Sequence, residues 1–112
     1  MPMLDREFWL KELMPVHGLM LDPDTDWKTF AQGVLIRAEQ HYGSAIPHTS
    51  QPQPGDEEKL RLLRGKLGVL GVQEHFGEKR CLDRVFHLLQ DGEVVDHVSN
   101  EDVFFLLYRL IE

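Results

Sequence analysis

The sequence predicts an all-α or mostly α fold of four or five helices. Apolar residues recur at intervals of three and four along most of the chain, which is the spacing of a helix face. Glycines, prolines and capping side chains separate these stretches at lengths typical of helices. A chain of 112 residues with 42% hydrophobic residues suits a single helical domain, 1–112, with a packed core. The residues expected in this core are Trp27, Phe30, Val34, Leu35, Leu63, Leu67, Val85, Phe86, Leu106, Leu107 and Leu110.

The first predicted helix covers about 5–14. Asp5 is its expected N-cap, and Leu10 and Leu13 give it an apolar face. Pro15 is expected to end this helix, because proline lacks the N–H that the helix interior requires.

The second predicted helix covers about 26–42 and has the clearest pattern in the chain. Asp24 or Thr25 is its expected cap, and Gly43 its expected end. Its apolar stripe consists of Trp27, Phe30, Ala31, Val34, Leu35, Ala38 and Tyr42.

Residues 43–56 are expected to form an exposed, proline-rich loop. They contain three prolines and two glycines and show no apolar periodicity. This connection is longer than most connections within a domain. Because neither flank is large enough to fold well alone, we still expect one domain.

The third predicted helix covers 57 to about 67, with Asp56 as its cap. Its apolar repeat consists of Leu60, Leu63, Leu67 and Leu70. Gly65, Gly68 and Gly71 recur at every third position, and each weakens a helix by up to ~1 kcal/mol relative to alanine. We expect them either to permit close helix contact or to mark a bend.

A fourth helix is predicted after Gly77, ending at Asp91 and Gly92. Its apolar residues are Cys81, Leu82, Val85, Phe86, Leu88 and Leu89. The alternative is a strand over 84–88 that turns at Asp91-Gly92 into a second strand. The helix is preferred because two-residue alternation is poor, although residues 93–98 suit a short extended segment.

The last predicted helix is apolar on every side. Ser99 and Asp102 form a capping pattern, and eight of the nine residues 103–111 are apolar or aromatic. Such a helix must be covered all round, so it is either central to the fold or partly an interface. The candidate interface residues are Phe104, Phe105 and Tyr108, with Phe8 and Trp9 from the N-terminal helix.

Residues able to carry chemistry form no recognisable catalytic or metal motif. The six histidines match neither H-E-x-x-H nor E-x-x-H. Cys81 falls on a buried stripe, which favours a core residue over a nucleophile. Asp83 and His87 are four residues apart and suit a surface pair. We therefore assign no catalytic, cofactor-binding or metal-binding residue.

Charge is distributed unevenly along this acidic chain of net charge −7. Residues 57–90 hold seven Lys and Arg against five Asp and Glu, whereas both ends are acidic. The candidate basic face consists of Lys59, Arg61, Arg64 and Lys66. It suits a solvated helix face or an acidic partner, and the acidic total disfavours general affinity for nucleic acid.

These observations favour a small non-enzymatic protein-binding module of the inhibitor, immunity-protein or adaptor type. Its expected partner is another protein or a second copy of itself. One alternative is a DNA-binding regulator with a helix-turn-helix-like unit at 57–92, and another is a small metal-assisted enzyme. A single cysteine, no apolar run of membrane length and no leader segment indicate a cytoplasmic protein.

Overall fold

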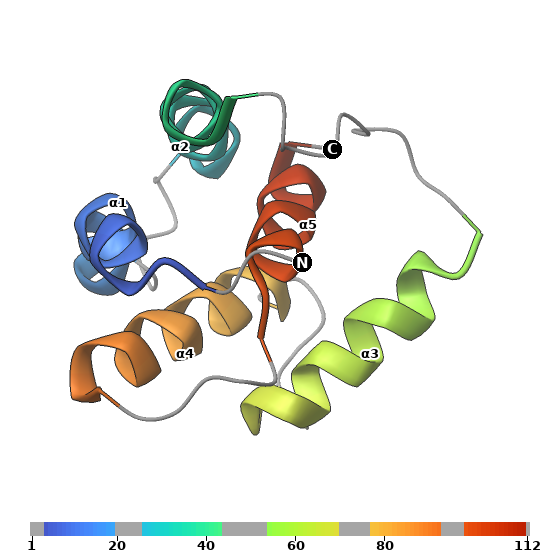
Figure 1. Cartoon of the computed structure of the whole chain (residues 1–112). Coiled ribbons are helices and arrows are strands. Elements are labelled where there is room, and N and C mark those ends of the chain that lie inside the picture. Colours follow the sequence, from blue (N-terminus) through green and yellow to red (C-terminus); the bar gives the residue numbers. More distant parts are fainter. Residues whose placement is uncertain (1–3, 20–25, 44–53, 70–76, 93–97, 112) are drawn as a thin grey trace.

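The computed structural model is a bundle of five helices, which confirms the all-α expectation (Figure 1). It describes residues 4–19, 26–43, 54–69, 77–92 and 98–111, and no strand occurs among them. The helices are α1 (Arg6–Leu19), α2 (Trp27–Tyr42), α3 (Asp56–Leu67), α4 (Gly77–Asp91) and α5 (Asn100–Ile111).

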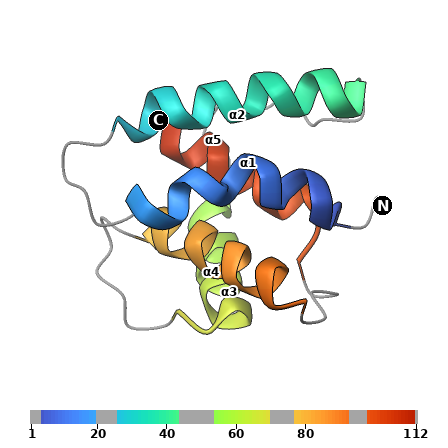
Figure 2. The same ribbon diagram turned by 90° about the vertical axis from the view of Figure 1, so that its left-hand side faces the viewer.

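Helices α4 and α5 lie in the middle of the bundle. Helix α4 packs against α1, α3 and α5, and α5 also packs against α2. Helices α1 and α2 lie on one side of this pair, and α3 lies on the other (Figures 1 and 2). The radius of gyration is 13.0 Å, matching the value of about 13 Å for a compact chain of this size.

Helix α1 continues beyond its predicted end. It runs through Pro15 to Leu19, so the expectation that Pro15 ends the helix was wrong. A proline inside a helix removes the hydrogen bond that its N–H would make to the carbonyl of Lys11, at a cost of about 3 kcal/mol. The packing of α1 against α4 is the tertiary contact that outweighs this local preference.

Helix α2 confirms the clearest sequence pattern, with its cap at a neighbouring residue. The carboxylate of Asp26 accepts a hydrogen bond from the Thr29 N–H at 3.1 Å. The choice of Asp24 or Thr25 as the cap was therefore wrong, and both lie outside the described residues. Gly43, with a φ of 65°, ends the helix as expected.

Helix α3 begins one residue earlier than expected and ends at a glycine. Asp56 is its first residue, so the cap position falls on Gly55. Gly68, with a φ of 72°, ends it. Gly65 lies within the helix and is exposed, with no atom within 4 Å of where a Cβ would stand. It therefore permits no close contact within the described fold, and Gly71 lies outside the described residues.

Helix α4 decides between the helix and the hairpin predicted for this region. Residues 84–88 are helical, so the strand alternative was wrong, and residues 93–97 lie outside the described residues. The Arg6 side chain of α1 donates from Nε to the Leu89 carbonyl at 2.6 Å. This bond satisfies one of the carbonyls that a helix leaves unpaired at its C-terminus.

Helix α5 has the predicted reciprocal cap. The Asp102 N–H donates to Ser99 Oγ at 3.2 Å, and the Ser99 N–H donates to Asp102 Oδ2 at 3.0 Å. Four apolar residues of the helix are buried, namely Val103, Phe104, Leu106 and Leu107. The remaining described apolar residues of α5 are partly buried.

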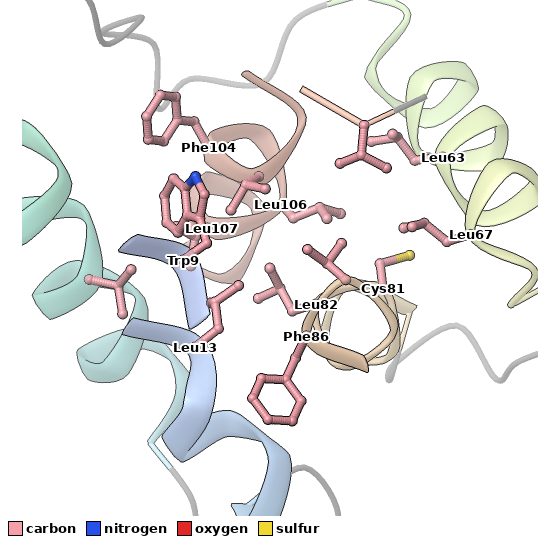
Figure 3. Packing of buried hydrophobic residues seen from close by; sticks show 14 of the residues in the cluster. Trp9, Leu13, Leu63, Leu67, Cys81, Leu82, Phe86, Phe104, Leu106 and Leu107 are labelled. Atoms are coloured by element: carbon pink, nitrogen blue, oxygen red, sulfur yellow. The ribbon is translucent and has the colours of Figure 1, made fainter. Parts of the chain in front are cut away.

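The core draws on all five helices (Figure 3). Eight of the predicted core residues are buried: Trp27, Val34, Leu63, Leu67, Val85, Phe86, Leu106 and Leu107. Phe30, Leu35 and Leu110 pack only partly buried against this cluster. The fully buried residues that the predicted core omitted include Trp9, Leu13, Leu60, Leu82 and Leu89.

Candidate functional site

Two of the five candidate interface residues lie in the core. Trp9 is 0% exposed and Phe104 is 3% exposed, and their ring centroids are 5.4 Å apart. Figure 3 shows them side by side between α1 and α5. They hold the folded chain together, so they offer no surface to a partner.

The other three candidates, Phe8, Phe105 and Tyr108, are half-buried. The Phe8 ring stacks on His41 with centroids 4.4 Å apart and planes at 7°. Lys59 Nζ lies 4.7 Å from the centroid of the Phe105 ring, which is a cation–π contact. The edges of these three rings are the part of the predicted interface that reaches the surface.

A polar cluster joins α1, α2 and α5. His41 Nε2 lies 3.0 Å from Asp5 Oδ2, and the Asp5 N–H donates to Asn100 Oδ1 at 3.3 Å. The same oxygen of Asn100 accepts a bond from the indole N–H of Trp9 at 2.8 Å. Asp5 also caps α1, because its Oδ1 accepts from the Phe8 N–H at 3.2 Å. We call these side chains the Asp5–His41 cluster.

The Asp5–His41 cluster has the parts of a hydrogen-bonded acid–base pair. A carboxylate that holds an imidazole fixes its orientation, and the His41 side chain remains 46% exposed. Burial, and secondarily the charge of Asp5, raise the pKa of the neighbouring Tyr42 well above its usual value. Tyr42 therefore stays a neutral phenol. Helical spacing does not predict this pair, because 36 residues separate its members.

The pair that the sequence did indicate is present on α4. His87 Nε2 lies 3.5 Å from Asp83 Oδ2, one helical turn away. Cys81 lies on the same helix and is buried, and Figure 3 shows it directed toward Leu67 of α3. Burial raises the pKa of the Cys81 thiol to about 12. The cysteine therefore acts as a small core residue, since the thiolate is the reactive form.

The candidate basic face lies on α3, and only part of it is free of contacts within the fold. Lys59, Arg61 and Lys66 are exposed. The Arg61 guanidinium is bound to the Glu58 carboxylate through two hydrogen bonds. Arg64 differs, because its guanidinium lies directly over Gly77 at the start of α4. The solvent-facing part of the predicted face is therefore Lys59, Arg61 and Lys66.

An ion-pair cluster at Arg109 joins α3 to the central helices α4 and α5. Arg109 of α5 lies 2.6 Å from Glu57 of α3 and 3.4 Å from Glu78 of α4. In the sequence, Arg109 is the one residue of 103–111 that is neither apolar nor aromatic. Its role is to join three helices.

The described side chains form no group of three or more metal-ligating residues. His41 and His87 are the histidines whose side chains are described. The side chains of His17, His48, His75 and His97 fall outside the described ones. Within the described helices, none is both long and apolar enough to cross a membrane.

The chain matches no protein-family model, no curated protein and no solved structure.

Proposed function

We propose that the chain is a small protein-binding module, which acts by occupying the surface of another protein. The observation that supports this most is the outer face of α3. This helix packs on α4 through Leu60, Leu63 and Leu67, whereas Leu62 on the opposite side is 51% exposed. An exposed leucine between exposed cations combines an apolar anchor with a charged rim, which is the usual anatomy of a binding surface.

The polar side chains support binding more than catalysis, because the fold uses them as connections between helices. Asp5 and His41 join α1 to α2, and Arg109 joins α5 to α3 and α4. Cys81 is buried beside α3 with a raised thiol pKa. General acid–base and nucleophilic catalysis both need such groups to face a substrate.

The DNA-binding alternative receives less support from the arrangement of α3 and α4. Residues 68–76 separate the two helices, whereas a helix-turn-helix has a turn of about three or four residues. Helix α4 would be the reading helix, yet it packs against three other helices. Arg84, a candidate base contact, instead donates to the Leu67 carbonyl at 3.1 Å.

Site-specific photo-crosslinking tests the proposal. A photoreactive residue replaces Leu62 on α3 in the full chain, and a matched chain carries it at Gln32, an exposed position on α2. We expect position 62 to give one discrete protein adduct in cell extract from the source organism, and position 32 to give none. The absence of adducts from every exposed position, or substrate turnover that a single polar-to-alanine change abolishes, would contradict the proposed function.

A further inference from the structure

The side of α3 that faces away from the bundle has an ordered pattern. Leu62 and Gly65 run along its middle, three residues apart and opposite the buried leucines. Arg61 borders this line on one side and Lys66 on the other. We call these four residues the α3 outer face. It contains an apolar side chain, a bare stretch of backbone and a cation on each edge, and the exposed Glu58, one turn before Leu62 on the same line, pairs with Arg61.

Gly65 is the residue of this face that the fold does not explain. A glycine within a helix is less favourable than alanine by up to about 1 kcal/mol. At Gly65 the space around an added Cβ is empty, so no neighbour in the described structure requires a glycine. A helical glycine that no neighbour in the described fold crowds leaves room for the close approach of another backbone.

The charges around this face favour an acidic partner. Residues 59–69 carry four cations and no acid, so the remaining chain has eight cations against nineteen acids. An acidic partner is therefore attracted to the end of α3 and repelled by the rest of the molecule. The contact of Arg61 with Glu58 does not prevent this, because both side chains are more than half exposed and such pairs contribute little.

We propose that the α3 outer face binds an acidic amphipathic helix of a partner protein. The partner helix packs an apolar ridge against Leu62, its backbone passes closest at Gly65, and its carboxylates meet Arg61 and Lys66. This inference rests on the proposed function and names the class of partner for that binding module.

The probe is a helical peptide selected from a displayed library by its binding to the intact chain. One face of each peptide is randomised, and binders are selected by the immobilised wild-type protein. We expect the enriched peptides to combine apolar residues at spacings of three and four with Asp or Glu on both flanks. Enrichment of basic or uncharged peptides, or no enrichment, would overturn the inference.

Two glycine variants separate binding from folding. Gly65→Ala is compared with Gly33→Ala on α2, where the space around an added Cβ is likewise empty. Both changes should raise the midpoint of denaturant unfolding, because both replace a helical glycine. Only Gly65→Ala should weaken binding of the selected peptide, with an affinity lower by roughly tenfold or more, because the alanine methyl group meets the partner backbone. Equal affinities for the two variants would overturn the close approach.

Charge reversal tests the acidic nature of the partner. The double variant Arg61→Glu, Lys66→Glu should abolish peptide binding, whereas Lys28→Glu on α2 should preserve it. If peptides bind the double variant as they bind the wild type, the α3 site is wrong while the proposed function survives, because that function depends on cross-linked adducts from any surface. If duplex DNA binds the wild type and displaces the peptide, the partner is a nucleic acid and the inference fails.

Discussion

Cys81 illustrates how burial determines the chemistry of a single residue. Its pKa of about 12 in the folded chain leaves almost no thiolate at pH 8. We therefore expect a thiol reagent at pH 8 to label the native protein only as fast as it unfolds, and to label the chain at once in denaturant. Labelling followed by mass spectrometry measures both rates. Equally fast reaction in native buffer would contradict the buried position.

The same raised pKa predicts a loss of stability in alkali. The folded chain holds the Cys81 proton more tightly than the unfolded chain does, whose thiol titrates near 8.5. The contribution of this proton to stability is complete below that pH, and it falls as the pH rises toward about 12. Denaturant unfolding of the wild type and of Cys81→Ala between pH 7 and about 11 should therefore diverge, with the wild type losing more stability. The same pH dependence of stability for the wild type and Cys81→Ala would contradict a raised pKa for the Cys81 thiol.

Leu106 tests whether the interior of the bundle is correctly placed. It is fully buried in the middle of α5, so Leu106→Ala should lower the free energy of unfolding by roughly 2–5 kcal/mol. The matched change Leu62→Ala, on the exposed side of α3, should change it by less than about 0.5 kcal/mol. Urea unfolding monitored by tryptophan fluorescence gives both values. A loss below about 1 kcal/mol at Leu106 would place the wrong face of α5 inside.

For single residues, helical spacing predicts contacts within one helix but does not predict contacts between helices. The pairing of Asp83 with His87 follows from helical spacing, and the structure brings the two within 3.5 Å. The pairing of Asp5 with His41 depends on how α1 packs beside α2. No local pattern encodes that packing, so the residues around Asp5 and around His41 could not predict the Asp5–His41 cluster.

Among the helices, α5 depends most clearly on its cap. Ser99 Oγ accepts from the Asp102 N–H, so Ser99→Ala should lower the free energy of unfolding by about 1 kcal/mol. Ser99→Thr retains a capping hydroxyl and should cost less. Thermal unfolding followed by circular dichroism compares the two variants. Equal losses would show that the capping bond does not stabilise α5.

Helix boundaries were predictable where a local rule had no competitor. Gly43 ends α2, and Ser99 with Asp102 caps α5, because glycine geometry and reciprocal capping act within a few residues. Pro15 has a local rule as well, but the packing of α1 on α4 opposes it. A boundary set by such competition cannot be obtained from the sequence around it.

For the whole molecule, the arrangement of helices resolves an alternative that the sequence left open. An entirely apolar α5 suited either a central helix or an interface. Helix α5 packs against both α2 and α4, and none of its described residues is exposed. Which helices cover α5 depends on long-range packing, so periodicity predicted the apolar surface but not its neighbours.

This central position leads us to expect a monomer. We expect light scattering to give the monomer mass of 13.0 kDa across a wide concentration range, because the buried part of α5 is covered within one chain. A charge at Phe104, which is 3% exposed, should unfold the protein, whereas Tyr108→Asp at a half-buried position should leave it folded. A doubled mass that Tyr108→Asp restores to the monomer value would instead support the homodimer.

The bond between Trp9 and Asn100 has a consequence for biosynthesis. Its two partners are 91 positions apart, so the ribosome adds 91 residues after Trp9 before the indole N–H can find its acceptor. Helices α4 and α5, on which α1 and α2 pack, are also translated after them. During translation the nascent segment of α1 and α2 therefore displays Trp9 and Leu13 without their cover, and we expect ribosome-associated chaperones to bind it.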